Sequence, residues 1–242
     1  MPVAQNRRAA VVACVGIGAL LVVGGLLVAM ALQLAPLAVA APPATASIVT
    51  VRAELTRVDL FPGGGEARYR SREVLAGRGA NEAVGKTGDV SGSLLFDHAG
   101  AVLPDQSRVT VDLRNLQSDN AMRDRYIQRM TMQTEQFPTA DFVLTAAPGL
   151  PLPLPTTGTA AFELVGDLTM HGVTRPTTWQ ATAIFGESEL TGSASTTVLL
   201  TEFGMEPPRA GPVLSIEDAV RLELDVKGTI APSIADLLND PT

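Results

Sequence analysis

Apolar and polar residues alternate with a period of two over much of the chain, and this pattern limits the fold more than any other feature. In residues 220–227 every second side chain is apolar, and the side chains between them are charged. Successive side chains of a β-strand point to opposite faces of a sheet, so this run predicts a strand with one buried and one solvated face. The period of 3.6 that an amphipathic helix requires is rare after residue 66.

Further alternating runs, separated by Gly, Pro, Asn and Asp, predict a sheet of several strands. The length after residue 66 suits about eight strands, and an antiparallel sheet of that size usually closes into a barrel. We therefore predict an all-β fold, an antiparallel β-barrel in one domain. The runs lie at residues 109–114, 142–144, 162–164 and 179–183, with proline-rich connections at 148–155 and 207–212.

One short helix is expected at residues 120–132. Met122, Tyr126, Ile127 and Met130 recur there at helical spacing, and Ser118 or Asp119 can cap the first turn. We expect this helix to cover one end of the barrel.

An uninterrupted apolar run, residues 9–32, follows Arg7 and Arg8. As a helix it reaches roughly 36 Å, which is enough to cross a hydrocarbon core about 30 Å thick. Basic residues beside a span stay on the cytoplasmic side, so the rest of the chain is expected outside the cytoplasm. We predict a single-pass transmembrane helix in the cell membrane.

Cleavage of this segment is the alternative. The A-x-A sequence that ends at Ala40 offers a signal-peptidase site, and cutting there would leave a secreted or periplasmic protein. The apolar run is longer than the core of a typical signal peptide, which favours retention. A lipoprotein box ending at Cys14 and a twin-arginine export signal fit the segment less well.

The chain divides into four segments by composition. Residues 1–34 form the cytoplasmic tip and the membrane helix, residues 35–65 an Ala/Pro-rich spacer and lead-in, residues 66–232 the barrel, and residues 233–242 a tail. Within the lead-in, residues 48–60 alternate loosely, which is typical of an extra strand or an extended approach to the barrel.

Charge and cysteine content narrow the possible partners and chemistry. The formal net charge is −7, and two of the 18 basic residues belong to the N-terminal segment, so the barrel is more acidic still. This balance disfavours nucleic acid as a partner. Cys14, the only cysteine, lies in the apolar run, which excludes a disulfide or a cysteine nucleophile from the barrel.

Three motifs recur in order along the barrel segment. The first is VSGSLLFD at 90–97 with SRVTVDL at 107–113; the second is LQSD at 116–119 with RD at 123–124 and FPTADF at 137–142; the third is GDLTMHGVTRP at 166–176 with FG at 203–204. Together they resemble the YceI family of exported lipid-binding proteins. The resemblance implies a lipocalin-like barrel whose elongated apolar interior holds a polyisoprenoid or a similar long-chain amphiphile.

The opening strand departs from the family pattern. Members of the family often carry an Asp and a His-Ser pair there, whereas residues 66–73 read EARYRSRE and contain no histidine. The mouth of the cavity, and with it the head group of the ligand, is therefore expected to differ.

Inward-facing apolar residues and the apolar residues of the helix are the candidate ligand contacts. Alternation is the same for a hollow and for a solid barrel, so plain core is the simpler reading of each candidate. The candidates are Phe96, Leu113, Met122, Tyr126, Phe142, Phe162, Leu164, Trp179, Phe185 and Phe203.

Arg123 and His171 are the head-group candidates. A guanidinium near the helix start can reach a phosphate or a carbonyl, and a structural salt bridge is the alternative reading. The His171 imidazole can bond a head group or fix its own turn.

Catalytic signatures are absent from the sequence. It has no G-x-S-x-G, no H-E-x-x-H and no P-loop, and neither histidine has companions spaced as metal ligands. We predict a non-enzyme with no metal and no cofactor other than a bound isoprenoid lipid.

The function predicted from these observations is binding or carriage of a long-chain apolar ligand, such as a polyisoprenoid or an isoprenoid quinone, at the outer face of the cytoplasmic membrane. The alternative is a structural or stress-related envelope adaptor with a solid barrel and a protein partner. Nothing in the sequence predicts an oligomeric state.

Overall fold

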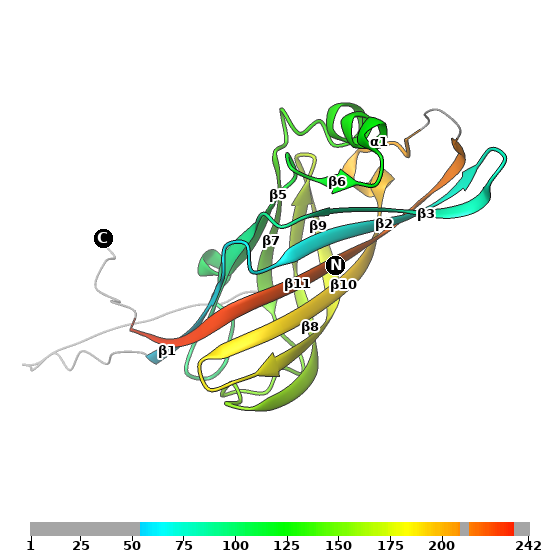
Figure 1. Ribbon diagram of the computed structural model, residues 1–242. Coiled ribbons are helices and arrows are strands. Elements are labelled where there is room, and N and C mark those ends of the chain that lie inside the picture. Colours follow the sequence, from blue (N-terminus) through cyan, green and yellow to red (C-terminus); the bar gives the residue numbers. More distant parts are fainter. Residues whose placement is uncertain (1–53, 209–212, 235–242) are drawn as a thin grey trace, which may run out of the picture. The chain divides into compact units, whose positions relative to one another are not determined.

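Eight antiparallel strands close into a barrel around an apolar core (Figure 1). The computed structural model describes residues 54–208 and 213–234. The barrel strands, in the order in which they pair, are β1 (Glu54–Leu60), β4 (Val90–Phe96), β5 (Arg108–Asp112), β7 (Thr139–Ala146), β8 (Gly158–Met170), β9 (Val173–Phe185), β10 (Glu189–Leu199) and β11 (Val213–Ile234). The all-β prediction, with about eight antiparallel strands and one short helix, is confirmed.

The long strand β11 closes the barrel because it pairs along both edges. One edge pairs with β10. The other edge pairs with β1 through residues 228–234 and with β2 (Glu66–Leu75) through residues 213–225. β2 continues into β3 (Gly79–Thr87), which pairs with the two-residue strand β6 (Gln117–Ser118), so a three-stranded arm of β11, β2 and β3 extends beyond the barrel (Figure 1).

Strand β1 lies in the segment that the sequence analysis assigned to the lead-in. Val58 and Leu60 are buried in the core, and β1 pairs with both β4 and β11. The glycines at 63–65 form the turn between β1 and β2, so the expected boundary at residue 66 falls after the first barrel strand.

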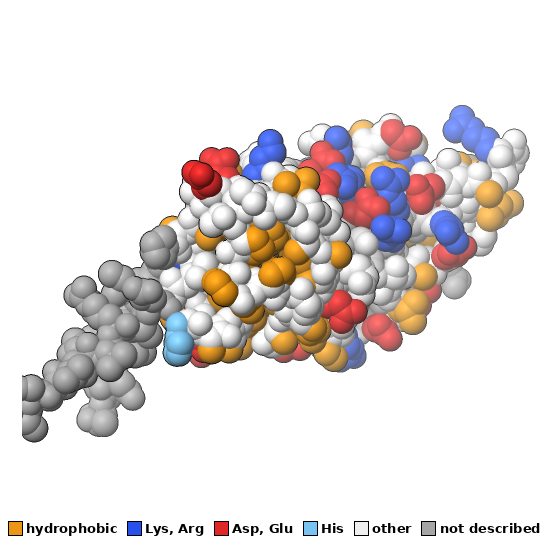
Figure 2. Space-filling model, turned by 90° about the horizontal axis from the view of Figure 1, so that it is seen from below, with side chains coloured by type: hydrophobic (Ala, Val, Ile, Leu, Met, Phe, Trp, Pro, Cys, Tyr) orange, Lys and Arg blue, Asp and Glu red, His pale blue; other side chains and the backbone are white. Residues whose placement is uncertain are grey.

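Alternation determines which side chains face the interior. Along β9, Trp179, Ala181, Ala183 and Phe185 are buried, and the residues between them are exposed. Seen from the end opposite to α1, apolar side chains gather in the middle of the face (Figure 2).

The helical segment covers one end of the barrel, as expected, but its cap differs from the prediction. α1 (Ala121–Tyr126) continues into a wider turn, η2 (Ile127–Thr131). Asn120 is the N-cap: its extended backbone lets Oδ1 accept from the amides of Met122 (3.0 Å) and Arg123 (3.2 Å). The predicted caps, Ser118 or Asp119, were therefore wrong.

Two short 3₁₀ turns complete the described elements, η1 (Pro104–Gln106) and η3 (Leu200–Phe203). Within 54–208 and 213–234, no helix has both the length and the apolar character of a membrane span. The predicted transmembrane helix, the spacer at 35–47 and the cleavage site after Ala40 lie outside the described residues.

Candidate functional site: a chambered apolar cavity

Three adjoining chambers run from the barrel interior to its helix end. The helix-end chamber, beneath α1, has a volume of about 640 Å³; the middle chamber has about 110 Å³ and the far-end chamber about 90 Å³. Tyr69, Met132, Met170 and Leu222 line both the helix-end and the middle chamber. Leu94, Val109, Leu164, Ala194 and Leu224 line both the middle and the far-end chamber. The chambers therefore follow one another through the barrel.

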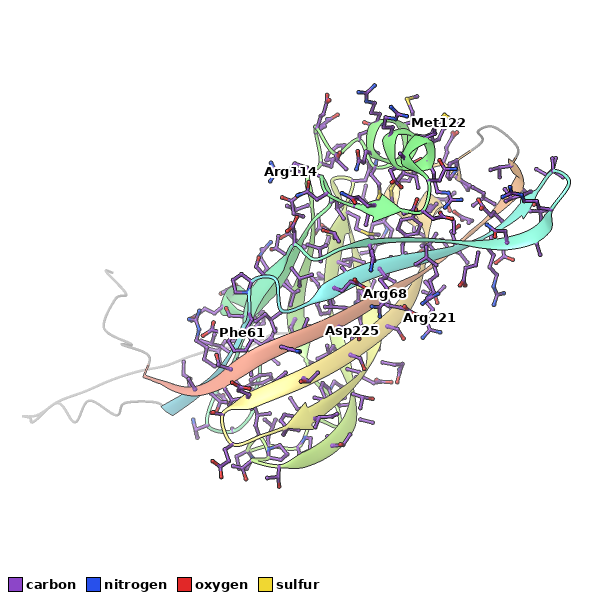
Figure 3. All side chains as sticks on the ribbon, in the orientation of Figure 1. Phe61, Arg68, Arg114, Met122, Arg221 and Asp225 are labelled. Carbon is purple, nitrogen blue, oxygen red and sulfur yellow. The ribbon has the colours of Figure 1, made fainter. Side chains whose placement is uncertain are left out.

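Nine of the ten predicted contacts and one head-group candidate line these chambers. Leu113, Phe142, Leu164 and Trp179 line the middle chamber; Phe96, Phe162, Leu164 and Phe185 line the far-end chamber; Met122, Tyr126 and Arg123 line the helix-end chamber. Met122 lies at the rim, 73% exposed on α1 (Figure 3). Phe203 lines none of the three and is packed into the core with 0% exposure.

His171 lies in the turn between β8 and β9 and lines none of the three chambers. Its Nδ1 is 3.3 Å from the carbonyl oxygen of Phe203, and its ring packs against that of Phe137 at 4.6 Å between centroids. The positive φ of 50° at His171 belongs to the turn itself. The contacts favour the turn-fixing reading of this histidine over the head-group reading.

The middle chamber has aromatic and aliphatic walls held by close strand contacts. The rings of Phe142 on β7 and Trp179 on β9 are 5.9 Å apart and tilted by 60°. Gly166 on β8 makes this possible, because a Cβ there would meet the Phe142 ring and the carbonyl oxygen of Val143. A large residue at position 166 would push Phe142 into the chamber.

Leu150 and Leu154 wall the far-end chamber from the proline-rich connection between β7 and β8. A backbone hydrogen bond from the amide of Glu163 to the carbonyl oxygen of Pro148 ties this connection to β8. The segment that the sequence marked only as a long connection thus contributes to the cavity.

Polar groups gather at the helix end. Glu73 on β2 is buried; its Oε1 accepts from Nδ2 of Asn81 at 2.6 Å and lies 3.3 Å from Nη2 of Arg123. Arg123 also donates through Nη1 to Asp119 at 2.6 Å. The hydroxyl of Ser71 is buried and has no hydrogen-bond partner among the described residues.

Tyr69 stands between the helix-end and middle chambers. Its ring covers Gly85 on the paired strand β3, where a Cβ would collide with it. Burial raises the pKa of Tyr69 to about 12, so its hydroxyl stays protonated at neutral pH and can donate a hydrogen bond.

Sequence reasoning missed Tyr69, Ser71 and Glu73. All three face inward from β2, in the stretch whose sequence departs from the family pattern. Their spacing of two residues was a usable signal, because residues two apart on a strand lie on the same face of the sheet.

The outward side chains of β2 and β11 form a charged network. Arg68 contacts Glu66, Glu223 and Asp225, and these contacts raise its pKa (Figure 3). Hydrogen bonds from Arg68 and Lys86 lower the pKa of Glu66. The network belongs to the solvated face of the sheet. Among the described residues, no group of three or more His, Cys, Asp or Glu side chains is placed to hold a metal ion.

A closed antiparallel barrel with an apolar interior cavity and a polar mouth defines a lipocalin-like barrel. Residues 65–228 match the model of the YceI-like domain, and the chain belongs to that family. It is 32% identical over 149 residues to a UPF0312 protein of Pseudomonas putida (strain GB-1). The matched region covers 58% of this chain and 70% of the relative. A UPF0312 protein of Pseudomonas fluorescens (strain SBW25) matches with the same identity and coverage.

Two solved structures share the fold. A polyisoprenoid binding domain from Saccharophagus degradans, implicated in plant cell wall breakdown, superposes with a TM-score of 0.56 at 11% identity, covering 72% of this chain and 98% of that one. BcnA of Burkholderia cenocepacia superposes with a TM-score of 0.52 at 15% identity, covering 70% and 99%.

Proposed function

We propose that this protein binds a long-chain apolar ligand of the polyisoprenoid type and performs no catalysis. The observation that carries the proposal is the apolar lining that continues from one chamber to the next, so that one extended chain can contact all three. The polyisoprenoid-binding description of the Saccharophagus degradans domain supports the same ligand class.

The energetics suit a thread-like hydrocarbon. Each methylene removed from water contributes about 0.8 kcal/mol, so a chain of several isoprene units binds without charged contacts. Met132 and Met170, between the helix-end and middle chambers, are unbranched and polarizable and adapt to an entering chain. In this arrangement the tail occupies the middle and far-end chambers, and the head lies beneath α1.

The N-terminal segment supports a proposal for the location of the protein. We propose that residues 9–32 cross the cytoplasmic membrane and keep the barrel at its outer face. Cleavage after Ala40 would instead release a soluble carrier. Sequencing the N-terminus of the mature protein from fractionated cells distinguishes the two, and recovery of the barrel in the cytoplasm would refute both.

Extraction tests the ligand directly. Full-length protein, purified in mild detergent, is extracted with organic solvent, and the extract is analysed by mass spectrometry for prenyl lipids. Trp179, the only tryptophan of the chain, lines the middle chamber and reports occupancy through its fluorescence. We expect a prenyl lipid in the extract and a saturable change in Trp179 emission when it is added back. Ligand-free protein with no response to added prenyl lipids would refute the proposal.

A further inference from the structure

Three polar side chains follow one another along the inward face of β2. Tyr69, Ser71 and Glu73 alternate with the outward residues Arg70 and Arg72, and all three line the helix-end chamber. Residues two apart on a strand are separated by about 7 Å, so the three form a short polar ladder from the middle chamber to the mouth. Below Tyr69, most residues that line the middle chamber are apolar.

The two inner positions of the ladder offer neutral hydroxyls. The Ser71 hydroxyl is buried against the helix-end chamber and has no partner among the described residues, although buried polar groups are normally paired. Tyr69 adds a second hydroxyl that stays protonated. An oxygen of a bound head group would supply the missing partner of Ser71.

The outer position carries a negative charge whose counter-ion is shared. Glu73 is 2% exposed at its side chain and faces Arg123, but Arg123 also binds Asp119. One guanidinium therefore serves two carboxylates. Arg78, the other cationic residue of the lining, is exposed in the turn between β2 and β3, at the outside of the mouth.

We propose that this chamber selects a prenyl chain with a neutral oxygen-bearing head, such as an alcohol, a phenol or a quinone carbonyl, over the diphosphate of the same chain. A neutral head accepts from or donates to the Ser71 and Tyr69 hydroxyls at no electrostatic cost. A diphosphate held at Ser71 lies beside Glu73, the next inward residue of β2, and because both residues are buried, salt screens the repulsion little. This inference rests on the proposed function and specifies its ligand.

Two probes of equal chain length test the selection. Delipidated full-length protein in mild detergent is titrated with geranylgeraniol and with geranylgeranyl diphosphate, and Trp179 emission is the readout. We expect the alcohol to bind at least about ten-fold more tightly, because the buried Glu73 carboxylate repels the charged diphosphate and not the neutral alcohol.

Variants locate the selection in the ladder. Glu73→Gln keeps the shape and removes the charge, and we expect the preference to fall to about three-fold or less through tighter diphosphate binding. Ser71→Ala should weaken binding of the alcohol, because the head group loses the Ser71 hydroxyl as its hydrogen-bond partner. The matched control is Glu82→Gln, which removes a carboxylate that pairs with Arg70 on the outer face and should leave the ratio as it is.

The outcomes separate this inference from the proposed function. If both probes bind and the diphosphate binds as tightly as the alcohol, or if Glu73→Gln leaves the ratio unchanged, the selection is refuted while lipid binding stands. If neither probe changes Trp179 emission and extraction yields no prenyl lipid, the proposed function fails and this inference with it.

Discussion

Arg123 on α1 reaches Glu73 on β2, with Nη2 3.3 Å from Oε1, and this contact ties the helix to the arm of the barrel. Removing one partner of a buried ion pair is costly because the other is left charged and unpaired. We expect Arg123→Ala to lower the free energy of unfolding by about 3 kcal/mol, measured by urea denaturation.

The matched control for Arg123→Ala is Arg57→Ala on β1. Arg57 and Asp59 form a pair in which both side chains are 43% exposed, so its loss should cost less than about 1 kcal/mol. Equal losses in the two variants would contradict a stabilising role for the Arg123–Glu73 contact.

Ala194 lies where the middle and far-end chambers meet, and a larger side chain there should close the passage. We expect Ala194→Phe to weaken prenyl lipid binding by at least about ten-fold and to cost about 1–3 kcal/mol of stability through overpacking. Trp179 titration and mass spectrometry of the extract measure the first effect. Thr197→Phe, at an exposed position of the same strand, should bind lipid normally. Wild-type affinity in Ala194→Phe would show that the chain does not pass this point.

Gly85 leaves the space that the Tyr69 ring occupies. Gly85→Ala forces the ring away from β3, and we expect a loss of about 1–3 kcal/mol in thermal or urea unfolding. At Gly88 the atom nearest to an added Cβ is 3.7 Å away, so Gly88→Ala should change stability by less than about 0.5 kcal/mol. If Gly85→Ala left the stability unchanged, the Tyr69 ring would be free to move away from β3.

Acid should weaken the outer charged network. Hydrogen bonds from Arg68 and Lys86 lower the pKa of Glu66 from its ordinary 4.5; at Glu223, burial raises the pKa, but hydrogen bonds from Arg70 and Arg68 outweigh it and lower the pKa. A lowered pKa in the folded state means that these carboxylates stabilise the fold above the ordinary pKa, and that the contribution is lost as the pH falls through the lowered value.

Arg68→Ala tests this network. The variant should be slightly less stable at neutral pH, by less than about 1 kcal/mol per exposed pair, and its melting temperature should fall less steeply than that of the wild type between about pH 5 and pH 3. Arg125→Ala is the control, because the Arg125 guanidinium bonds only to the backbone oxygen of Ala121 among the described residues. If the melting temperature of Arg68→Ala fell with pH as steeply as that of the wild type, Arg68 would not be the source of the lowered carboxylate pKa values.

Most of the fold could be predicted because alternation depends only on local geometry. The run at 220–227 and the run at 179–183 identify β11 and β9 and their inward faces. The helix cap was less accessible, because Ser118, Asp119 and Asn120 are all good N-caps. The backbone angles that decide among them depend on how β6 pairs with β3.

The cavity was predictable only in part. The sequence makes Leu113 and Phe203 equal candidates, but only packing in three dimensions separates Leu113, which lines the middle chamber, from Phe203, which lies in the solid core. Glu73 was hidden for another reason. A buried carboxylate is stable only with its partner, and Arg123 lies 50 residues further along the chain.

Because β11 pairs along both of its edges, barrel closure during folding depends on this strand. Its partner β1 is the first strand of the described chain, and β11 is the last. Such non-local pairing makes folding slow, because a long loop must close before the contact forms. The barrel therefore cannot seal until β11 is available for pairing. Until then β1 and β10 each expose an unpaired edge, so the chain is most vulnerable to aggregation and proteolysis before β11 joins the sheet.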